Sequence, residues 1–415
     1  MRVIGIIAEY NPFHNGHEYL IRKARESVGD SRAVVMSIMS GPFTQRGLPA
    51  VAPSHVRAKA ALLCGSDVVL ELPFEFACAP ANEFAYGAVR SLMATGVVTD
   101  IAFGIDSGSP GIIEFLSSPD LYSSPEYQEA LKASLSDGMS FPAASAKAVI
   151  ASVSDCPFDQ DQLADCMHSP NAILAIEYLK AMKALGARFK VHMINRTGQG
   201  YSEDDIEASD IPSATSIRKA LYTCEGSVAK AGNILSGAVP DASAAVFLSA
   251  LSKKSFTVTD LNMYALRAVT SMPDDMPSIR FCGDGLSGYL TNTLSELRGS
   301  DVSFEELSSK LFTKHFTMPR IYRALTMMML GVKSDDVCRD PEYIKVLGFN
   351  HEGRYCLKIM GKCAKLPVIH KHSDFLEYPS LANTKKINED AINLADTFMG
   401  IAPFSLWNDH PVVVK

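Results

Sequence analysis

The sequence lacks the features that identify several classes of protein. Its 9 cysteines include no Cys-x-x-Cys pair, so the sequence indicates neither a zinc ribbon nor a disulfide framework, and we expect small buried thiols in a reduced protein. No apolar run approaches the roughly 20 residues that cross a bilayer, and the short apolar run after Arg2 cannot serve as a secretory signal. We therefore expect a soluble cytoplasmic protein with no membrane partner.

Positive charge is also scarce. The chain has 39 Lys and Arg against 46 Asp and Glu, which gives a net charge of −7. This balance argues against a protein that contacts nucleic acid over its whole surface, so any RNA binding must come from a local basic patch. With 415 residues, 47% of them hydrophobic, the chain is long enough for two or three domains with sizeable cores.

Short apolar runs and helical patterns alternate in the first half of the chain. Continuous apolar runs separated by helices are typical of a parallel sheet that is covered on both faces. We therefore predict an α/β fold, a Rossmann-like doubly wound sheet. The expected strands are residues 3–9, 33–39, 67–73, 100–106 and 189–195, and the expected crossover helices are residues 17–28, 54–65 and 83–96.

Beyond about residue 240 long amphipathic stretches dominate, and strand signals are nearly absent apart from a short hairpin expected near residues 342–360. A segment rich in Gly, Ser and Pro separates the two patterns between residues 225 and 245. We expect one domain at residues 1–235 and a second, mainly α-helical domain at residues 236–415. The expected helices of the second domain include residues 241–254, 259–272, 304–312 and 318–331.

Two histidines flank Asn15 and Gly16 where the first strand passes into the first helix. A loop at this place presents free backbone N–H groups and the positive end of the helix dipole, which suit phosphate. His14 and His17 can donate hydrogen bonds to phosphate oxygens as charge develops at the α-phosphorus of a nucleoside triphosphate, while Gly16 lets the ligand approach. Alternatives are a helix cap, a packed histidine or a metal site, for which no further ligand is evident nearby.

A second helix start has the residues that a phosphate site needs. Ser213 and Thr215 can cap the helix or touch phosphate, and Arg218, one turn later, can reach a triphosphate with its planar fork of donors. Taken alone, the segment also fits an ordinary N-cap followed by a solvated arginine. Together with the His-x-Gly-His loop, it resembles the paired motifs of the nucleotidylyltransferase superfamily, although Ala214 replaces the usual second serine.

The resemblance becomes closer along most of the chain. "EYNPFHNGH", "MSGPFTQRGLPAV", "FGID", "SPNAILAIEYLKA", "PSATSIR", "KVLGF" and "SDF" resemble the bacterial tRNA(Met) cytidine acetate ligase family. That family activates acetate with ATP as acetyl-adenylate, and it transfers the acetyl group to N4 of the wobble cytidine of elongator tRNA(Met). The resemblance therefore implies that residues 1–235 are the ATP-binding catalytic domain and that residues 236–415 bind tRNA.

The resemblance also implies an ATP site built from one continuous segment and a few separate residues. Gly104 ends an expected strand, where a side chain would obstruct a ligand, whereas Asn171 also fits an N-terminal cap and Arg196 also fits a solvated position. The implied ATP contacts are Ile7, Ala8, Glu9, Tyr10, Asn11, Pro12, Phe13, His14, Asn15, Gly16, His17, Glu18, Tyr19, Leu20, Gly104, Asn171, Arg196, Thr197, Ser213, Thr215 and Arg218.

Two further groups of polar residues are open to more than one interpretation. Gln45 and Arg46, in a loop after the second strand, fit closure over an acyl-adenylate, contact with RNA, or an exposed loop. The candidate RNA contacts in the helical part are Lys310, Lys314, Arg320 and Arg323, for which a solvated helix face is the alternative.

Departures from the family pattern lie mainly in the second half. "DGLSGYL" lacks the Asn and Arg of the usual segment, which bears on the choice of tRNA more than on ATP chemistry. We expect ATP and acetate as substrates, Mg²⁺ on the phosphates and His14, His17 and Arg218 as catalytic residues. The alternatives are a small-molecule nucleotidylyltransferase and a catalytically inactive, nucleotide-responsive RNA-binding protein. The sequence leaves the acyl group, the tRNA, the Mg²⁺ ligands and the oligomeric state open.

Overall fold

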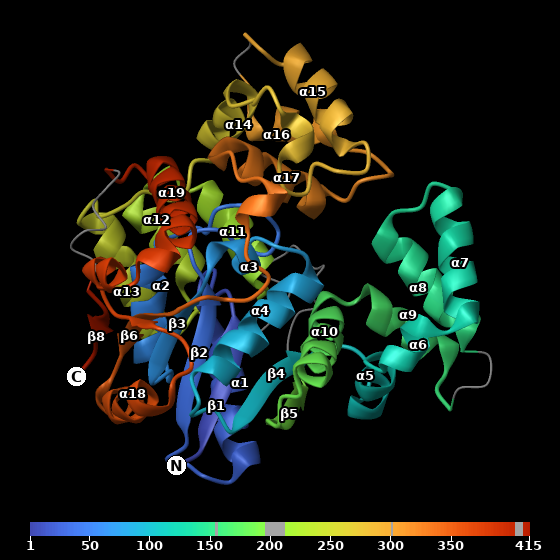
Figure 1. Cartoon of the computed structure of the whole chain (residues 1–415). Helices are drawn as coiled ribbons and strands as arrows, with labels where there is room; N and C mark the ends of the chain where they lie inside the picture. Colours follow the sequence, from blue (N-terminus) through green and yellow to red (C-terminus); the bar gives the residue numbers. More distant parts are fainter. Residues whose placement is uncertain (154–156, 196–211, 300–301, 403–409) are drawn as a thin grey trace.

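The computed structural model describes residues 1–153, 157–195, 212–299, 302–402 and 410–415. These residues form an eight-stranded sheet with the order β5-β4-β1-β2-β3-β6-β7, in which β8 pairs with β6 (Figure 1). The strands are β1 (Val3–Ala8), β2 (Val34–Ser40), β3 (Val68–Leu72), β4 (Asp100–Ile105), β5 (Lys190–Asn195), β6 (Ile344–Phe349), β7 (Val368–Ile369) and β8 (Val412–Val413).

The first five strands confirm the predicted doubly wound sheet. They are parallel, in the order β3-β2-β1-β4-β5. In β1, Val3 and Ile7 contribute to the core on one face of the sheet, whereas Ile4 and Ile6 contribute to the core on the other. Both faces are buried, which is why the strands appear in the sequence as continuous apolar runs rather than as an alternating pattern.

Helices cover both faces of this sheet. Ile21 and Ala24 of α1 (Asn15–Val28) and Ala61 of α2 (Ser54–Leu63) belong to the core on one face. The core on the other face contains α4 (Ala81–Ala94), α10 (Pro170–Leu185) and α18 (His351–Cys363). The expected helices at 17–28, 54–65 and 83–96 are thus confirmed as α1, α2 and α4.

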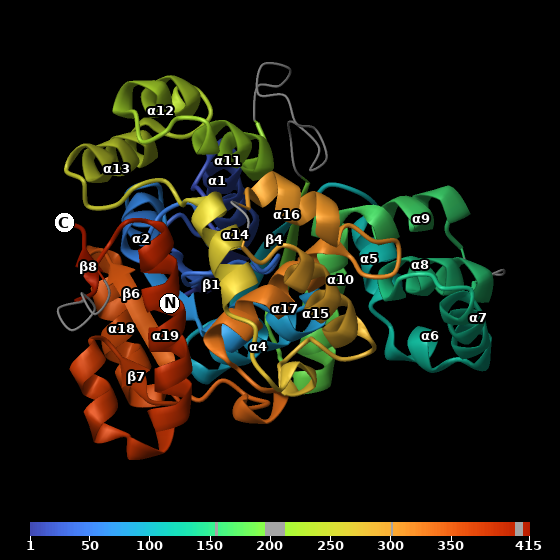
Figure 2. The same cartoon turned by 90° about the horizontal axis from the view of Figure 1, so that it is seen from above.

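A helical insertion separates β4 from α10. It lies on the side of the molecule opposite to α18, β6 and β7 (Figure 2). Prolines occupy the first or second position of four of its helices, where the missing N–H costs nothing. The insertion comprises α5 (Pro110–Leu116), α6 (Pro119–Ser123), α7 (Pro125–Ser136), α8 (Phe141–Ser152) and α9 (Gln160–His168).

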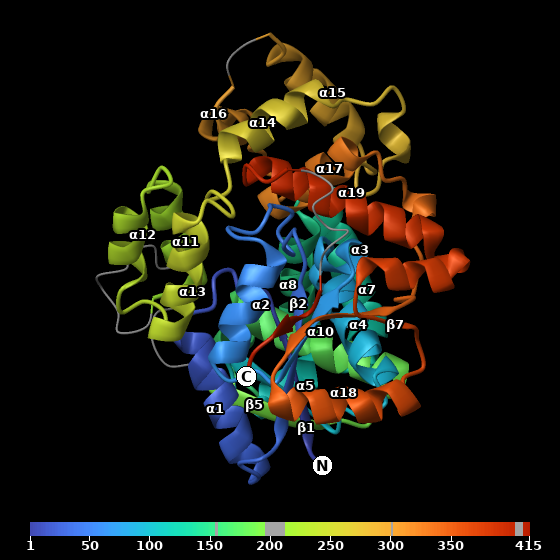
Figure 3. The same cartoon turned by 90° about the vertical axis from the view of Figure 1, so that its left-hand side faces the viewer.

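The helices that follow β5, apart from α18, share one apolar core, to which Phe43, Val51 and Phe74 of the first half also belong. Figure 3 shows two groups of them, α11–α13 beside the sheet and α14–α17 above it. Every helix in the described part of the chain is too short or too polar to cross a bilayer. The helices that share this apolar core are α11 (Ala214–Tyr222), α12 (Val228–Leu235), α13 (Asp241–Ser252), α14 (Leu261–Thr270), α15 (Leu286–Glu296), α16 (Phe304–Leu311), α17 (Met318–Leu330) and α19 (Ala382–Phe398). The short α3 (Phe74–Ala77) packs near α19.

The expected hairpin near residues 342–360 is wrong. β6 is followed directly by α18, because the Asn350 side chain accepts a hydrogen bond from the Gly353 N–H at 2.9 Å and so caps a helix instead of forming a turn. β6 pairs antiparallel with β3. The sheet of the first half therefore contains strands from beyond residue 236, and the division into domains at residue 235 stays a prediction.

Glu75 of α3 is a buried carboxyl group in the packing between the sheet and α19. Its side chain is 2% exposed, and its Oε2 accepts a hydrogen bond from Asn388 Nδ2 at 3.0 Å. Burial raises the pKa of Glu75 to about 7, because the charged form loses its hydration, and the bond from Asn388 opposes this rise only in part. Between the ordinary pKa of 4.5 and about 7, the folded protein binds a proton at this site that the unfolded chain does not.

We predict that Glu75 lowers the free energy of unfolding as pH rises from about 4.5 to 7, by about 3 kcal/mol in total. Glu75→Gln keeps an acceptor for Asn388 but cannot ionise. Urea unfolding of both proteins at pH 5 and pH 8 checks this, and the variant should gain stability relative to the native protein between the two values. A stability difference between the two proteins that is the same at both pH values would contradict the prediction.

Candidate active site

A cavity of about 550 Å³ opens at the carboxyl ends of β1 and β4. These neighbouring strands lead to opposite sides of the sheet, and ligands of doubly wound folds bind at such a switch point. Most of the predicted ATP contacts meet there. Those that line the cavity are Ile7, Ala8, Glu9, Tyr10, Asn11, His14, Gly16, His17, Tyr19, Leu20, Gly104, Asn171, Ser213 and Arg218.

His14 and His17 are held by the backbone at the start of α1. Nδ1 of His14 accepts a hydrogen bond from the Gly16 N–H at 3.0 Å, and Nδ1 of His17 accepts one from the His14 N–H at 3.2 Å. A backbone N–H can only donate, so each neutral ring carries its proton on Nε2. The ring centroids lie 3.9 Å apart, and both residues line the cavity. The histidines are thus helix caps, as one alternative held, and they also offer Nε2–H donors.

Arg218 joins the two predicted motifs. Its Nη1 donates to the Asn11 carbonyl at 2.8 Å, in the loop after β1, and its Nη2 donates to Thr215 Oγ1 at 3.1 Å. Ser213 is the N-cap of α11 and accepts a hydrogen bond from the Ser216 N–H at 3.1 Å. The guanidinium therefore lies between the first loop and the start of α11, at the same cavity as the two histidines.

The opposite part of the cavity is formed by the ends of β4 and β5 and by α10. Asn171 lies at the second position of α10, and its amide donates to Asp106, which also accepts from Ser169, the N-cap of this helix. Leu174 and Tyr178, which the sequence analysis missed, line the cavity beside Asn171. Their spacing of three and seven residues from Asn171 places all three on one face of α10, a signal that was present in the sequence. Arg196 and Thr197 lie outside the described residues.

Some residues of the predicted segment do not line the cavity. Phe13 is fully buried in the core below α1, and Glu18 is exposed. Asn15 Nδ2 donates to the Gly237 carbonyl at 2.7 Å, so it ties the start of α1 to the α12–α13 link. Pro12 is buried, and Thr215 contacts Arg218 instead of the cavity.

The four candidate RNA contacts of the helical part divide into two groups. Lys310 and Lys314 are exposed, and Arg320 forms an ion pair with Asp284 at 2.9 Å. The prediction that Arg323 lies on an RNA-contacting or solvated helix face is wrong, because Arg323 is only 7% exposed and lines the cavity. The burial arises because α17 packs against the loop between β2 and α2, so that Nη1 of Arg323 reaches a loop carbonyl.

That loop is fixed from the other side by Arg57, a residue of α2 that the sequence analysis did not single out. The Arg57 guanidinium is buried and donates to the carbonyls of Glu9 at 2.7 Å, of Ser40 and Ala52 at 2.9 Å, and of Gly41. Burial lowers the pKa of Arg57 to about 10, so the group stays charged at neutral pH. Arg57 therefore holds the ends of β1 and β2 and the loop in one arrangement.

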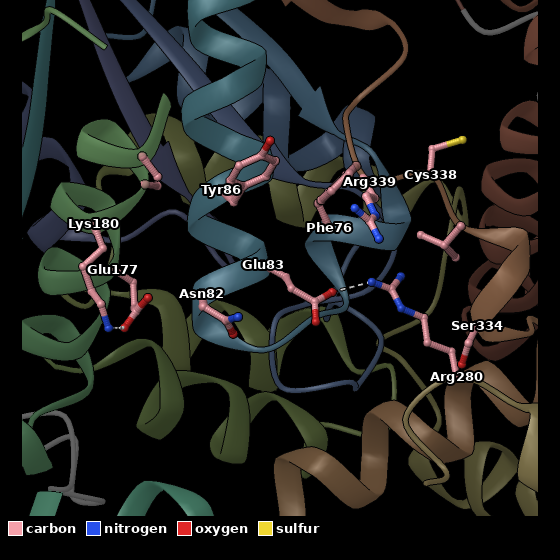
Figure 4. Close-up of a pocket in the computed structure, with 13 residues that line it drawn as sticks. Phe76, Asn82, Glu83, Tyr86, Glu177, Lys180, Arg280, Ser334, Cys338 and Arg339 are labelled. Carbon is pink, nitrogen blue, oxygen red and sulfur yellow. Dashed lines mark hydrogen bonds and ion pairs between the residues drawn. The ribbon is translucent and has the colours of Figure 1, made fainter. Parts of the chain in front are cut away.

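A second cavity, of about 430 Å³, lies between α4, α10 and residues 280 and 334–339 (Figure 4). Glu83 pairs there with Arg280, and Glu177 pairs with Lys180 at 2.9 Å. Most of the charged groups that line this second cavity form ion pairs with one another. None of the predicted ATP contacts lines it. Nor do the described residues assemble three or more His, Cys, Asp or Glu side chains that would hold a metal ion. The cavity at β1 and β4 is therefore the candidate active site.

If His14 both caps α1 and binds ATP, two substitutions should separate these roles by their effects on stability and on ATP affinity. His14→Ala removes both the cap and the ring, so we expect it to lower the free energy of unfolding by about 1 kcal/mol. His14→Asn restores a cap acceptor, so its stability should lie within about 0.3 kcal/mol of the native protein. Both variants lose the Nε2–H donor and should bind ATP about tenfold more weakly in calorimetry. ATP affinity that recovers with the cap in His14→Asn would assign the ring a purely structural role.

Comparisons with known proteins agree with this geometry. The family model for HIGH nucleotidyl transferases matches residues 1–398. The chain is 33% identical over 379 residues to the tRNA(Met) cytidine acetate ligase of Clostridium perfringens strain ATCC 13124, with 90% of each chain covered. It is 34% identical over 374 residues to that of Syntrophotalea carbinolica, with 89% of this chain and 84% of the relative covered.

Two crystal structures of Thermotoga maritima TmcAL are similar over the whole of both chains. The apo form has a TM-score of 0.88 and 29% sequence identity, and the form bound with alpha-thio ATP has a TM-score of 0.83 and 30% identity. Both the fold and the sequence over its full length therefore point to one group of enzymes. The chain belongs to the tRNA(Met) cytidine acetate ligase family of the HIGH nucleotidyl transferases.

Proposed function

We propose that this protein is an ATP-dependent ligase of the cytoplasm, which activates acetate as acetyl-adenylate and acetylates N4 of the wobble cytidine of elongator tRNA(Met). The observation that carries the proposal is the convergence of His14, His17 and Arg218 at one cavity, beside strand ends of the kind that bind nucleotides. The names of the relatives support the tRNA and the acetate, and the neighbour bound with alpha-thio ATP supports the nucleotide.

In the first step a carboxylate oxygen of acetate attacks the α-phosphorus of ATP, and the bond from that phosphorus to the pyrophosphate oxygen breaks. Negative charge increases on the leaving pyrophosphate. The Nε2–H groups of the two histidines, the Arg218 guanidinium and the start of α1 are donors that the fold has already oriented, so they stabilise that charge without a reorganisation cost.

In the second step the exocyclic amine of cytosine attacks the acetyl carbonyl. The bond from the carbonyl carbon to the phosphate oxygen breaks, AMP leaves with the electron pair, and the amine loses a proton. No protein nucleophile takes part. Mg²⁺ is expected on the triphosphate, but the described residues offer no cluster of ligands for it, so we assign it no protein ligand and no step.

The tRNA should approach past the link between α16 and α17. Thr317 and Pro319 line the cavity, and exposed Lys314 precedes Thr317 by three residues. Lys310 is exposed at the end of α16, and Arg320 lies at the start of α17. We propose that Lys310, Lys314 and Arg320 contact the RNA backbone, whose phosphates provide affinity that does not depend on sequence and weakens with salt.

The direct test is to incubate the protein with ATP and radiolabelled acetate, with and without total tRNA. We expect acetyl-adenylate and pyrophosphate without RNA, and N4-acetylcytidine in elongator tRNA(Met) when RNA is present. AMP transfer to a small phosphorylated substrate without acetate would indicate a nucleotidylyltransferase instead. Absence of ATP turnover with any acyl donor would indicate a catalytically inactive binding protein.

For the first step, we predict that His17→Ala lowers acetate-dependent exchange of pyrophosphate into ATP about a hundredfold, the scale of losing one oriented donor to developing charge. His351→Ala is the matched control, because His351 is an exposed histidine at the start of α18. His351→Ala should unfold at the native temperature, whereas His17→Ala should remain folded but unfold somewhat lower, because it loses the acceptor for the His14 N–H. A near-normal exchange rate in folded His17→Ala would remove His17 from the catalytic residues.

For the second step, we predict that the double change Lys310→Glu and Lys314→Glu reduces acetyl transfer to tRNA at least about tenfold at low salt, with a smaller fold-loss at higher salt, because fewer phosphate contacts give a shallower salt dependence. Pyrophosphate exchange should be unchanged, because both lysines are exposed and neither lines the cavity. Lys362→Glu with Lys365→Glu reverses two exposed charges near the far end of α18 and should affect neither step. Equal transfer by the two double variants would argue against an RNA contact at Lys310 and Lys314.

A further inference from the structure

One side of the cavity is formed by residues that are not among the proposed nucleotide contacts. It consists of Gln45 and Arg46 in the loop between β2 and α2, the start of α4, and Thr317, Pro319 and Arg323 from α17 and the residue before it. Acetate and the acceptor base must enter the cavity beside the nucleotide, so this boundary is where they have room. Two of its residues, Arg46 and Arg323, carry guanidinium groups, which suit a carboxylate.

The peptide group of Gln45 is held on both sides. Its N–H donates to Oε1 of Glu9, at the end of β1, at 2.8 Å. The Gln45 carbonyl accepts from Nη1 of Arg323 at 3.0 Å. Two residues later the Gly47 carbonyl accepts from Thr326 Oγ1 at 2.7 Å. The turn that carries Gln45 and Arg46 is thus fixed between the central strand of the sheet and α17.

There is no free space between this turn and α17. Gly47 has a φ of 90°, and a Cβ built on it would lie 2.3 Å from the backbone nitrogen of Arg323. The position therefore requires glycine for both its conformation and its contact. A turn packed so closely on α17 cannot shift without moving the helix, so the backbone from which Gln45 and Arg46 extend has a defined position at the cavity.

Arg323 destabilises the fold in a way that a residue with a purely structural role would not. Its side chain is more than nine-tenths buried, and its Nε is buried without a hydrogen-bond partner among the described residues. Burial lowers the pKa of Arg323 to about 10, so the group remains charged at neutral pH. A buried charge with an unpaired donor destabilises a fold, whereas methionine or leucine would fill the same space at lower cost.

We propose that Arg323 is a positioning residue for acetate activation: it fixes the Gln45 peptide, and through it holds Arg46 where its guanidinium binds the carboxylate of acetate. This inference rests on the proposed function. Acetate has one carboxylate and one methyl group, so a few donors must set its orientation for in-line attack, and small displacements of such donors reduce rates strongly. The planar fork of an arginine matches a carboxylate with two parallel hydrogen bonds.

The test is acetate-dependent pyrophosphate exchange by the full-length protein, with the KM values for acetate and ATP measured separately. Arg323→Gln should raise the KM for acetate at least tenfold and leave the KM for ATP within twofold of the native value. Arg323→Lys keeps one donor for the Gln45 carbonyl and should recover part of the loss. Arg267→Gln is the matched control, because Arg267 is exposed on α14, and it should change neither value.

A double-mutant cycle separates positioning from direct contact. Arg46→Gln should raise the KM for acetate to a similar extent, and the combination of Arg323→Gln and Arg46→Gln should be little worse than either single change. If Arg323→Gln does not fold, Arg323→Lys and Arg46→Gln carry the test, and an unchanged KM for acetate in both overturns the proposal.

Other outcomes would also overturn it. An equal rise in both KM values would mean that Arg323 supports the whole cavity. A loss confined to the transfer of acetate to tRNA, and sensitive to salt, would make Arg323 an RNA contact. If the native protein shows no acetate-dependent exchange, the proposed function itself fails. An active native protein with an unaffected Arg323→Gln variant rejects only the role of Arg323.

Discussion

The guanidinium of Arg57 joins the ends of β1 and β2 to the loop between β2 and α2. It donates to carbonyls of Glu9, Ser40, Gly41 and Ala52, so nearly every donor of a buried cation is satisfied by backbone at the site. Such complete pairing offsets much of the free-energy cost of burying the Arg57 charge. Since the segment after Glu9 carries both histidines, the geometry of the proposed phosphate donors depends on this one side chain.

The same loop also connects the sheet to the helical half of the chain. Phe43 and Val51 lie in the core of the helices, and the Ala50 carbonyl accepts a hydrogen bond from Thr259. Asn11, next to the histidine motif, accepts from the Val51 N–H through its side chain at 2.8 Å. Parts of the molecule that the sequence suggests are separate domains are therefore joined at the cavity through one loop.

The sequence predicts well the features that depend on local pattern. The five parallel strands appear as apolar runs, and the helix starts at His14 and Ser213 appear as capping residues followed by amphipathic segments. Contacts between distant segments leave no such pattern. Arg57 and Arg323 appear in the sequence as ordinary polar positions on helices, and only tertiary packing buries them. In the same way, Asn350 near Gly353 is typical of a turn, whereas the structure uses it to cap α18.

The position of β6 has a consequence for how the protein is made. β3 is synthesised early, but the strand that pairs with its outer edge, Ile344–Phe349, is synthesised only after the helical insertion and most of the remaining helices. At 5–20 residues per second the ribosome needs roughly 10–50 s to cover this distance. During that time an apolar strand has an open row of backbone donors and acceptors, which is a template for pairing with other chains. Nascent or truncated chains that end before residue 344 should therefore depend on chaperones and tend to aggregate, and the first half of the chain would not persist as a smaller folded protein.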